Sequence, residues 1–312
     1  MKSQDIQVSI CVVTYNQEKY IADCLDSLLS QKTNFKFEII VGEDCSKDST
    51  RAIVQKYAEQ YPDLIVPLLY EKNVGPVENL KRVYQKAKGK YIAHMDGDDL
   101  ALPNKLQKQF DILEANPDCS ICVHNMNAVD GNSQKMNRAF LLFDERKYSL
   151  LDMYLINPFF IHSSKMFVNK TDEYIEQLNE NALDIEMHIE QAKQGDIYFL
   201  GECLGVYRQF VGVTYEGKLI NPLIPERIQE IYRKFPSQKF TVDDVNKVKK
   251  KYAYILLQYE NHYVIHNDFK KAKEFFLKSI KYHIGFLSIL FSMILFFPKI
   301  LRKVLVCRNQ WK

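Results

Sequence analysis

The sequence predicts an α/β protein with a Rossmann-like, mainly parallel central sheet and a helical C-terminal region. Over the first half of the chain, short apolar runs alternate with stretches whose apolar residues recur at helical spacing, which is typical of βαβ units. Polar and acidic residues gather directly after three of these runs. From Pro225 onward the pattern is helical, with no linker rich in Gly, Pro or Ser. We therefore expect a main domain over residues 1–215 and a helical region over residues 216–312 that packs against it.

The expected strands of the first half are continuous apolar runs, the pattern of strands covered on both faces. They lie at 8–13, 37–41, 64–70 and 91–95. Helices are expected where apolar residues form one stripe, at 18–30, 46–60 and 77–87. The second of these helices begins with Ser and Asp residues that favour a helix start, and the third ends at Lys88-Gly89. In such a sheet, ligands bind beyond the carboxyl ends of the strands.

Beyond Pro103 strands and helices no longer alternate so regularly. Helices are expected at 105–115, 182–193, 242–264 and 269–283. Strands are expected at 120–129, 159–168 and 197–200, with a turn at Asp130-Gly131 after the first of them.

Composition and charge limit the functional classes. The 312 residues are 46% hydrophobic and 26% charged, which argues against global disorder. A net charge of +3 gives no reason to expect a nucleic-acid partner. Seven irregularly spaced cysteines do not form a disulfide framework, and Cys119 and Cys122 make a lone CxxC inside a strand-like run. Residues 1–7 do not resemble a secretory signal, so we expect a reducing, cytoplasmic location.

The strongest local signal is Asp96-Gly97-Asp98-Asp99, directly after a buried strand. Three carboxylates in four residues repel one another unless a cation offsets their charge. Mg²⁺ and Mn²⁺ prefer oxygen ligands, commonly one or two carboxylates together with substrate phosphates. The segment therefore predicts a site for a cation and a diphosphate, against the alternative of a solvated acidic loop.

A second acidic pair, Glu43-Asp44, ends another strand at the same predicted edge. Its functional interpretation is hydrogen bonding to a nucleobase or a ribose hydroxyl. The alternative is that residues 44–48 cap the next helix, and we leave Asp48 and Ser49 with that cap.

Four segments occur in order along the chain: VSICVVTYN at 8–16, EDCSKDST at 43–50, NVG at 73–75 and KYIAHMDGDD at 90–99. Their order and spacing resemble family 2 glycosyltransferases of the GT-A fold, such as those that build bacterial surface polysaccharides. The resemblance covers roughly the first 210 residues, and four ordered motifs are more specific than any one of them. It implies an inverting hexosyltransferase that uses a nucleotide-sugar, commonly UDP-linked, together with Mn²⁺ or Mg²⁺.

The resemblance also implies roles for residues at the nucleotide. Thr14, Asn16 and Asn73 would line the nucleotide-sugar site, and Asp44 would contact the base. Glu43 stands where family members usually have Asp. It keeps a carboxylate with a different reach, which leaves the identity of the nucleotide open.

By the same resemblance, Asp98 would be the direct metal ligand, and Asp96 would lie near the ribose or join Asp98 at the metal. Arg208, in a Tyr-Arg pair, would contact the diphosphate or order a closing loop, with a plain surface Arg as the alternative. His162, in His-Ser-Ser, resembles residues on the acceptor side, although a structural histidine is the commoner outcome.

An inverting transfer needs a base that takes the proton of the acceptor hydroxyl. The family places this base at the start of a helix in the second half of the domain, which corresponds here to residues 182–188. We expect Asp184 to be the base. Glu186 is the alternative, because it points about 200° away around the helix and the phase of the helix is unknown.

Residues 284–297 are apolar apart from Gly285, Ser288 and Ser292, and basic residues flank them on both sides. A helix of this length would be about 21 Å long, short of the roughly 30 Å hydrocarbon core of a bilayer. We therefore expect residues 284–306 to lie in the interface of an anionic membrane, with a buried docking helix and then a true span as alternatives. A peripheral location at the inner face of the cytoplasmic membrane would suit a lipid-linked or growing surface glycan as acceptor.

This chain lacks the motifs of other α/β enzyme classes. The turn after the first strand, residues 14–18, contains no glycine, so the GxGxxG loop of dehydrogenases and methyltransferases is missing. The sequence GxxxxGK[ST] of a P-loop does not occur either. A sugar nucleotidyltransferase, or a nucleotide-sugar-binding protein without transfer activity, stays as an alternative.

Overall fold

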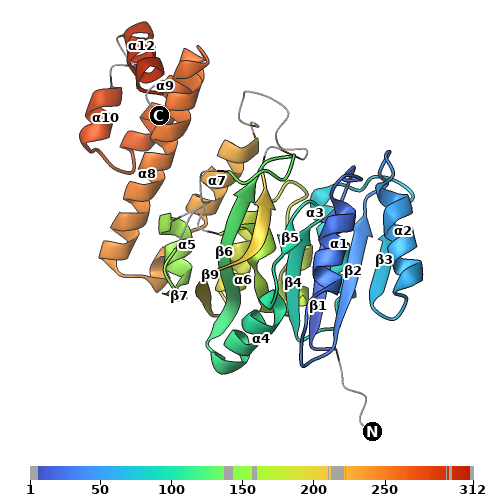
Figure 1. Ribbon diagram of the computed structural model, residues 1–312. Coiled ribbons are helices and arrows are strands. Elements are labelled where there is room, and N and C mark those ends of the chain that lie inside the picture. The colour runs from blue at the N-terminus through green and yellow to red at the C-terminus, as the bar shows by residue number, and fades with distance from the viewer. Residues whose placement is uncertain are drawn as a thin grey trace. The chain divides into compact units, whose positions relative to one another are not determined.

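Figure 1 shows the computed structural model, which describes residues 6–136, 143–156, 160–209, 211, 221, 223–292, 294 and 297–309. The chain separates into two compact units, residues 1–216 and 217–312. The first unit is α/β and the second is helical, and each has its own core.

In the described part of the first unit, nine strands form one sheet in the order β3-β2-β1-β4-β8-β6-β9-β5, with β7 beside β9. Strands β1 to β4 pair in parallel, and so do β6 and β9. The shorter strands β5, β7 and β8 pair antiparallel with their neighbours. The bounds are β1 Val8–Thr14, β2 Phe37–Glu43, β3 Ile65–Leu69, β4 Tyr91–Asp96, β5 Leu100–Ala101, β6 Cys119–Val129, β7 Arg146–Tyr148, β8 Met166–Val168 and β9 Asp196–Arg208. The predicted α/β class with a central parallel sheet is confirmed.

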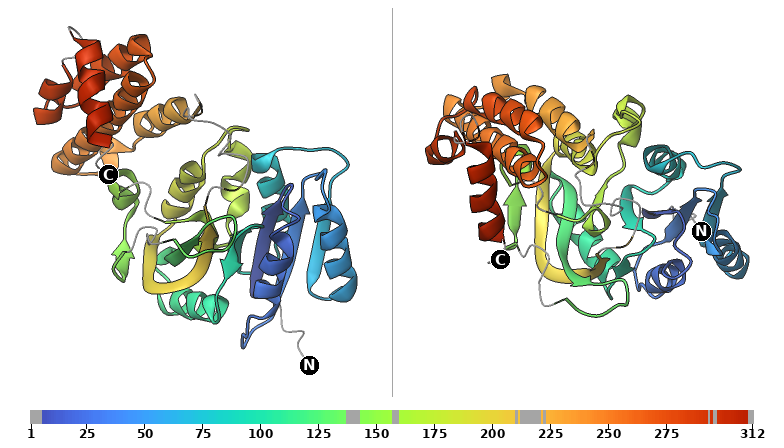
Figure 2. Two further views of the ribbon diagram at one scale, coloured as in Figure 1. Left: turned by 45° about the horizontal axis from the view of Figure 1, so that its top comes forward. Right: turned by 90° about the horizontal axis from the view of Figure 1, so that it is seen from above.

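Helices α1 (Ile21–Leu29), α2 (Thr50–Gln60) and α3 (Pro76–Lys86) connect the parallel strands. Right-handed crossovers place α1 and α2 on one face of the sheet and α3 on the other, because β4 lies on the opposite side of β1 from β2 and β3. The views in Figure 2 show this division. The buried residues of α1 recur at helical spacing, as the sequence predicts: Ile21, Cys24, Leu25 and Leu28.

Two strands in the second half of the unit differ from the prediction. The expected strand at 159–168 is wrong over its middle, where η1 (His162–Ser164) is a 3₁₀ turn and only β8 is extended; residue 159 lies outside the described residues. The Ser164 hydroxyl and N–H both donate to Ile161 O, which favours the turn. Strand β9 extends well beyond the predicted 197–200. Gly201 and Glu202 interrupt its apolar pattern, so the sequence indicates only the first part of the strand.

Further helices complete this half. The predicted helices at 105–115 and 182–193 correspond to α4 (Lys105–Ala115) and α6 (Asp184–Ala192). The sequence does not predict α5 (Leu150–Ile156), β7, or the 3₁₀ turns η2 (Thr171–Glu173) and η3 (Ile175–Gln177).

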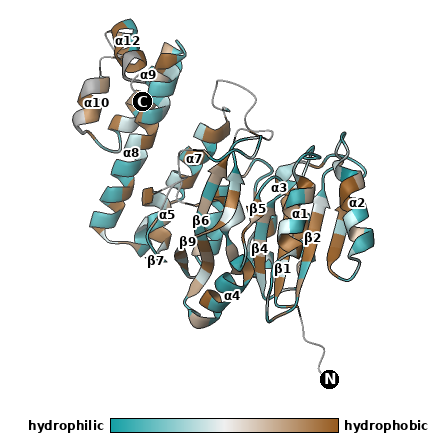
Figure 3. Cartoon of the chain, in the orientation of Figure 1, coloured by the Kyte–Doolittle hydropathy of each residue, from teal (hydrophilic) through white to brown (hydrophobic). Residues whose placement is uncertain are grey.

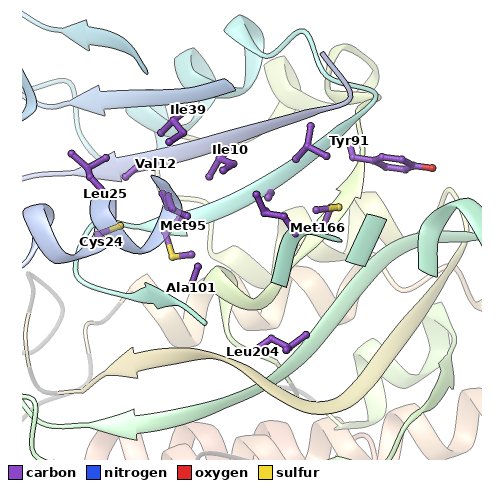
Figure 4. Close-up of a cluster of buried hydrophobic side chains, with 14 of the residues drawn as sticks. Ile10, Val12, Cys24, Leu25, Ile39, Tyr91, Met95, Ala101, Met166 and Leu204 are labelled. Atoms are coloured by element: carbon purple, nitrogen blue, oxygen red, sulfur yellow. The ribbon is translucent and has the colours of Figure 1, made fainter. Parts of the chain in front are cut away.

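The core of the first unit lies between the parallel strands and the helices on their faces, and it continues into the second half of the sheet. Figure 4 shows side chains from strands far apart in the sequence in this one cluster. Val12 of β1, Met95 of β4, Met166 of β8 and Leu204 of β9 belong to it, and each is at most 5% exposed. Burial of this kind contributes about 25 cal/mol per Å² of apolar surface, which holds the strand ends in fixed relative positions.

The second unit is helical in its described residues, as predicted. It comprises α7 (Leu223–Arg233), η5 (Ser237–Lys239), α8 (Val242–Ile265), α9 (Phe269–Ile280), α10 (Phe286–Phe291) and α12 (Pro298–Asn309). The caps are local: the Thr241 hydroxyl accepts from Asp244 N at the start of α8, and the Asp268 carboxylate accepts from Lys271 N at the start of α9. Figure 3 shows hydrophobic and hydrophilic residues alternating along α8, in keeping with a helix that packs on one side.

The apolar segment at 284–297 is less regular than a single helix. Within its described part, α10 covers only residues 286–291, and residues 293, 295 and 296 lie outside the description. Pro298 begins α12, in the first helical position that suits proline. Among the described residues, no helix has both the length and the hydropathy needed to cross a bilayer.

Candidate active site

The carboxyl ends of β1, β2 and β4 lie side by side. In the parallel register Thr14 pairs with Glu43, and Val13 pairs with Asp96. The N–H of Asp44 donates to Thr14 O at 3.1 Å, which continues the pairing past the end of β2. The fold therefore brings the three polar segments that the sequence singles out to one edge of the sheet.

The loops after β1 and β2 are tied together through Asn16. This residue has a φ of 52°, a left-handed conformation that Asn tolerates better than most residues. Its side-chain Oδ1 accepts from Lys47 N at 2.8 Å, and its N–H donates to Ser46 Oγ at 2.9 Å. The Glu18 carboxylate accepts from Ser49 N in the same loop. Asn16 thus shapes this edge of the site through both its backbone and its side chain.

Glu43 is fully buried, and both of its carboxylate oxygens have partners within the protein. Oε1 accepts from Ser46 N at 2.6 Å, and Oε2 forms an ion pair with Arg51 Nε at 2.6 Å. Arg51 also donates to Tyr70 O. The carboxylate that the sequence assigns to the nucleotide therefore holds the loop after β2 in this structure.

Asp44 holds the loop before α3. Its Oδ1 accepts from Val74 N at 2.6 Å and its Oδ2 accepts from Gly75 N at 3.0 Å, while Asn73 Nδ2 donates to Asp44 O. Burial raises the pKa of Asp44 above its usual value, although the two N–H groups oppose this. Gly75 has a φ of 87°, which a side chain would strain. Asp44 and Asn73 thus join the ends of β2 and β3, beside the predicted nucleotide.

The acidic segment after β4 places its three carboxylates in different surroundings. Asp96 is 37% exposed; its Oδ1 lies 3.2 Å from His94 Nε2, and its Oδ2 accepts from Ser163 Oγ. Asp98 is partly buried and contacts Gln17, whose Oε1 also accepts from Thr14 Oγ1 at 2.7 Å. The segment is thereby linked to β1 as well as to the 3₁₀ turn η1.

The electrostatics of these carboxylates favour a cation. Burial and then repulsion from Asp96 raise the pKa of Asp98 to about 7. Partial burial alone would raise the pKa of Asp96 too, but the His94 hydrogen bond and the nearby His162 hold it below its usual value. Burial and both neighbouring carboxylates raise the pKa of Asp99. A divalent cation near Asp98 would offset this repulsion.

Arg208, at the end of β9, is 3% exposed and joins three segments. Its Nε donates to Asp98 O at 3.1 Å, and its Nη1 donates to Asp130 O and to Ser133 Oγ. The guanidinium carbon lies 4.5 Å from the centre of the Tyr20 ring. The interpretation of Arg208 as a plain surface residue is therefore wrong, since the side chain is buried beside the acidic segment.

Asp184 and Glu186 open α6 with different surroundings. The Asp184 side chain is 68% exposed, and its Oδ1 lies 3.2 Å from His162 Nδ1. Glu186 Oε1 accepts from Leu183 N at 3.0 Å, so this carboxylate caps the helix. The surroundings favour Asp184 over Glu186 as a group that is free to meet a substrate.

A buried polar cluster behind the site was not predicted from the sequence. Tyr84 OH lies 3.0 Å from His94 Nδ1 and 3.4 Å from His162 Nε2, and the ring centroids of the two histidines are 3.8 Å apart. Lys165, fully buried, donates to Gln191 Oε1 at 3.2 Å. A polar residue inside an apolar run, such as His94 in β4, is the sequence feature that could have indicated this cluster.

The residues present fit a divalent cation held mainly by its substrate. Among the described residues, no group of three or more His, Cys, Asp or Glu side chains could hold a metal by itself. Asp98 and Asp96 nevertheless offer carboxylate oxygens at the end of β4, where burial and then repulsion from Asp96 raise the pKa of Asp98. Mg²⁺ commonly takes one or two carboxylates and completes its shell with phosphate oxygens and water.

Comparison with known proteins agrees with this geometry. The family model described as glycosyl transferase family 2 matches residues 9–175, more than half of the chain. The uncharacterized protein Rv1520 of Mycobacterium tuberculosis is 33% identical over 205 residues, which are 65% of this chain and 58% of that protein. The putative teichuronic acid biosynthesis glycosyltransferase TuaG of Bacillus subtilis is 34% identical over 125 residues, 40% of this chain and 49% of TuaG. The aligned part of this chain thus spans about half the length of these relatives.

Solved structures show the same fold. The structure of S. aureus TarS 1-349 in complex with UDP-GlcNAc matches with a TM-score of 0.68 at 17% identity, covering 98% of this chain and 93% of that chain. A second TarS structure, in complex with UDP, matches with a TM-score of 0.57. At this identity the likeness concerns the fold, and it confirms the predicted GT-A architecture.

Proposed function

Because this chain belongs to glycosyl transferase family 2, we propose that it is an inverting glycosyltransferase that moves a sugar from a nucleotide diphosphate-sugar to an acceptor hydroxyl. One observation supports the proposal most strongly. The acidic segment after β4 and the exposed carboxylate of Asp184 flank the same buried cluster, through His94 on one side and His162 on the other. The residues proposed for the cation-diphosphate site and for the base thus lie on two sides of one buried cluster.

The donor in this proposal is UDP-linked. Thr14, Asn16 and Asn73, with Asp44 behind them, form the sheet edge at which a nucleotide would bind. Support comes from the TarS structures, whose titles name UDP-GlcNAc and UDP as bound molecules. The buried ion pair of Glu43 with Arg51 would act on the nucleotide through the shape of the loop.

Mn²⁺ or Mg²⁺ is the proposed cofactor, with Asp98 as its principal protein ligand and Asp96 as the second candidate. When bound, the cation would offset the charge that develops on the departing diphosphate. Arg208 lies beside Asp98 and adds a fixed positive charge on the same side.

Asp184 is the proposed base. It takes the proton from the acceptor hydroxyl as that oxygen forms a bond with the anomeric carbon, while the bond from this carbon to the diphosphate oxygen breaks and the electron pair leaves with the diphosphate. Attack from the face opposite the leaving group inverts the configuration. The exposure of Asp184 supports this role, because a base must reach a substrate.

The proposed acceptor is a lipid-linked or growing surface glycan. The relative TuaG, named for teichuronic acid biosynthesis, supports a surface glycan as acceptor. The second unit supports a peripheral place on an anionic membrane: Ile289, Phe297 and Ile300 are each more than half exposed, and α12 also exposes Lys299 and Lys303.

A screen of nucleotide-sugars for metal-dependent release of free nucleotide tests the proposal. We expect UDP-sugars to be turned over with Mn²⁺ or Mg²⁺, and Asp184→Asn to lower turnover by about 10²-fold or more while UDP binding by calorimetry is kept. The matched control is Glu186→Gln, whose amide oxygen can still accept from Leu183 N, and it should keep most of the activity. UDP binding without any turnover would point to the nucleotide-sugar-binding alternative, and release of pyrophosphate to a nucleotidyltransferase.

A further inference from the structure

His162 is a buried histidine whose two ring nitrogens have different surroundings. Its side chain is 6% exposed, and its Nε2 lies 3.4 Å from the hydroxyl of Tyr84. Its Nδ1 lies 3.2 Å from Asp184 Oδ1, yet among the described residues this nitrogen has no hydrogen-bond partner. Buried polar atoms almost always have a partner, so an unpartnered nitrogen facing the proposed base needs an explanation.

The hydrogen-bond chain behind His162 determines which of its nitrogens carries the proton. Asp96 is a carboxylate and accepts, so His94 Nε2 is the donor in their 3.2 Å contact. A neutral imidazole then offers His94 Nδ1 as an acceptor, and Tyr84 OH, 3.0 Å away, donates to it. The hydroxyl has one proton, so its oxygen accepts from the next group in the chain, His162 Nε2.

This chain of donors leaves the lone pair of His162 on Nδ1, the ring nitrogen that lies 3.2 Å from Asp184 Oδ1. Burial holds the pKa of His162 well below its usual value, which keeps the ring neutral. His94 and Lys165 also lower the pKa of His162, and Asp96 raises it by a smaller amount. A lone pair cannot bond an ionised carboxylate, but it can accept a proton that a carboxyl group carries.

We propose that His162 is a positioning residue for Asp184, held in its Nε2–H form by Tyr84 and His94, and that its Nδ1 accepts a hydrogen bond from Asp184 once that carboxyl has taken the proton of the acceptor hydroxyl. This inference rests on the proposed function for the role of Asp184. In the resting site Asp184 is free to turn toward the acceptor. After the transfer the proton lies on the carboxyl group between Asp184 Oδ1 and His162 Nδ1, and no further group is needed to hold it.

His162→Phe tests the proposal with little change of side-chain shape. We expect kcat to fall roughly 10-fold or more with an unchanged KM for the donor, because the proton on Asp184 loses its acceptor. The acidic limb of the kcat–pH profile should move to lower pH by about 0.5 unit or more, since loss of this hydrogen bond disfavours the protonated carboxyl. His188→Phe is the matched control: this buried ring also packs on His162, at 5.0 Å between centroids, and it should leave the limb in place.

Tyr84→Phe provides a milder variant, because it removes a single hydroxyl. It frees His162 to carry its proton on Nδ1 and donate to the ionised carboxylate, so the acidic limb should again move to lower pH. Unchanged limbs in both His162→Phe and Tyr84→Phe, in a chain that transfers sugar and is inactivated by Asp184→Asn, would overturn the positioning role alone.

The tautomer can be measured even if the chain proves inactive. Nitrogen NMR of the full chain with labelled histidine, with the His162 signal assigned by its loss in His162→Phe, distinguishes the two neutral forms. We expect His162 in the Nε2–H form in the wild type and a shift toward Nδ1–H in Tyr84→Phe. An Nδ1–H form in the wild type contradicts the proposal whatever the activity, whereas absent turnover with the expected tautomer counts against the proposed function.

Discussion

The backbone N–H of Arg208 donates to Oδ1 of the buried Asp99 at 2.9 Å, and this bond joins the end of β9 to the acidic segment after β4. The third carboxylate of the segment therefore acts within the protein, whereas Asp96 and Asp98 remain accessible in part. The bond also fixes the backbone from which the Arg208 side chain reaches Asp98 O and Ser133 Oγ. Asp99 thus fixes the position of Arg208, and it does so without being exposed itself.

Arg208→Lys should weaken the binding of UDP in the presence of Mn²⁺ by roughly 10-fold or more. A lysine cannot reproduce the forked donors that reach Asp98 O, Asp130 O and Ser133 Oγ, nor the flat stacking on Tyr20. Calorimetry with UDP measures the loss. Arg233→Lys makes the same exchange at an exposed arginine that pairs with Glu230 in the second unit, and it should bind UDP like the wild type. Equal affinities for both variants would contradict the role assigned to Arg208.

Asp98→Asn should raise the thermal stability of the metal-free protein more at pH 8 than at pH 5. The pKa of Asp98 is raised to about 7 in the folded chain from a usual value of 3.8. The folded state therefore binds this proton more tightly than the unfolded state, and the resulting stability, full below the usual pKa, is lost as pH rises through about 7. The amide is not subject to this loss.

We expect the advantage of Asp98→Asn in Tm to be about 2–4 °C larger at the higher pH, given the partial solvent screening at this site. Mn²⁺ with UDP should then raise the Tm of the wild type but not that of the variant. A gain in Tm that is the same at both pH values would mean that the pKa of Asp98 is not raised in the folded chain.

The acidic segment and the polar ends of β1 and β2 could be predicted from sequence, because each follows a recognisable apolar run and parallel strands align their carboxyl ends. The cluster of Tyr84, His94 and His162 could not. Its members come from α3, β4 and η1, and their contacts depend on how α3 and η1 pack against the sheet.

Particular side-chain contacts explain the remaining differences between the predicted and the observed structure. The sequence assigns Glu43 to the nucleotide because it ends a strand, but Arg51, the second residue of α2 and 8 residues on, forms an ion pair with it. The strand expected at 159–168 is interrupted because serine side chains hydrogen-bond nearby backbone groups and favour turns. Both effects involve particular side-chain contacts that hydropathy patterns do not reveal.

Asp44→Asn should loosen the segment from Asn73 to Gly75. One carboxylate oxygen bonds Val74 N and the other bonds Gly75 N, and an amide offers a single acceptor in their place. Hydrogen exchange at these amides should become faster by roughly 5-fold or more, as expected for the loss of about 1 kcal/mol. Mass spectrometry of peptides that span residues 73–78 measures the exchange.

The control for Asp44→Asn is Asp152→Asn, which alters a carboxylate that bonds Ser149 N and its hydroxyl near α5. This variant should change exchange near residue 149 and leave residues 73–75 unaffected. If exchange at Val74 and Gly75 proved the same in Asp44→Asn and in the wild type, the loop would be held by other contacts.

One face of α12 should govern binding to anionic membranes. Leu301 and Leu305 are buried in the second unit, whereas Ile300 and Val304, one position before each, are about half exposed beside the exposed Lys299 and Lys303. An apolar face bordered by lysines favours the interface of a bilayer that contains anionic lipids.

Sedimentation of the full chain with vesicles of phosphatidylglycerol and phosphatidylcholine tests this role of α12. We expect the wild type to bind, and the double variant Ile300→Ser with Val304→Ser to bind roughly 10-fold more weakly, because two apolar side chains no longer enter the interface.

Lys299→Gln with Lys303→Gln should lose most of the added binding that anionic lipid provides, by about 1 kcal/mol for each lysine. The matched control is Lys247→Gln, a lysine in an exposed ion pair with Asp243 on α8, which should bind like the wild type. Vesicle binding that neither double variant weakens would show that another surface meets the membrane. A wild-type chain that does not sediment with the vesicles would contradict membrane binding altogether.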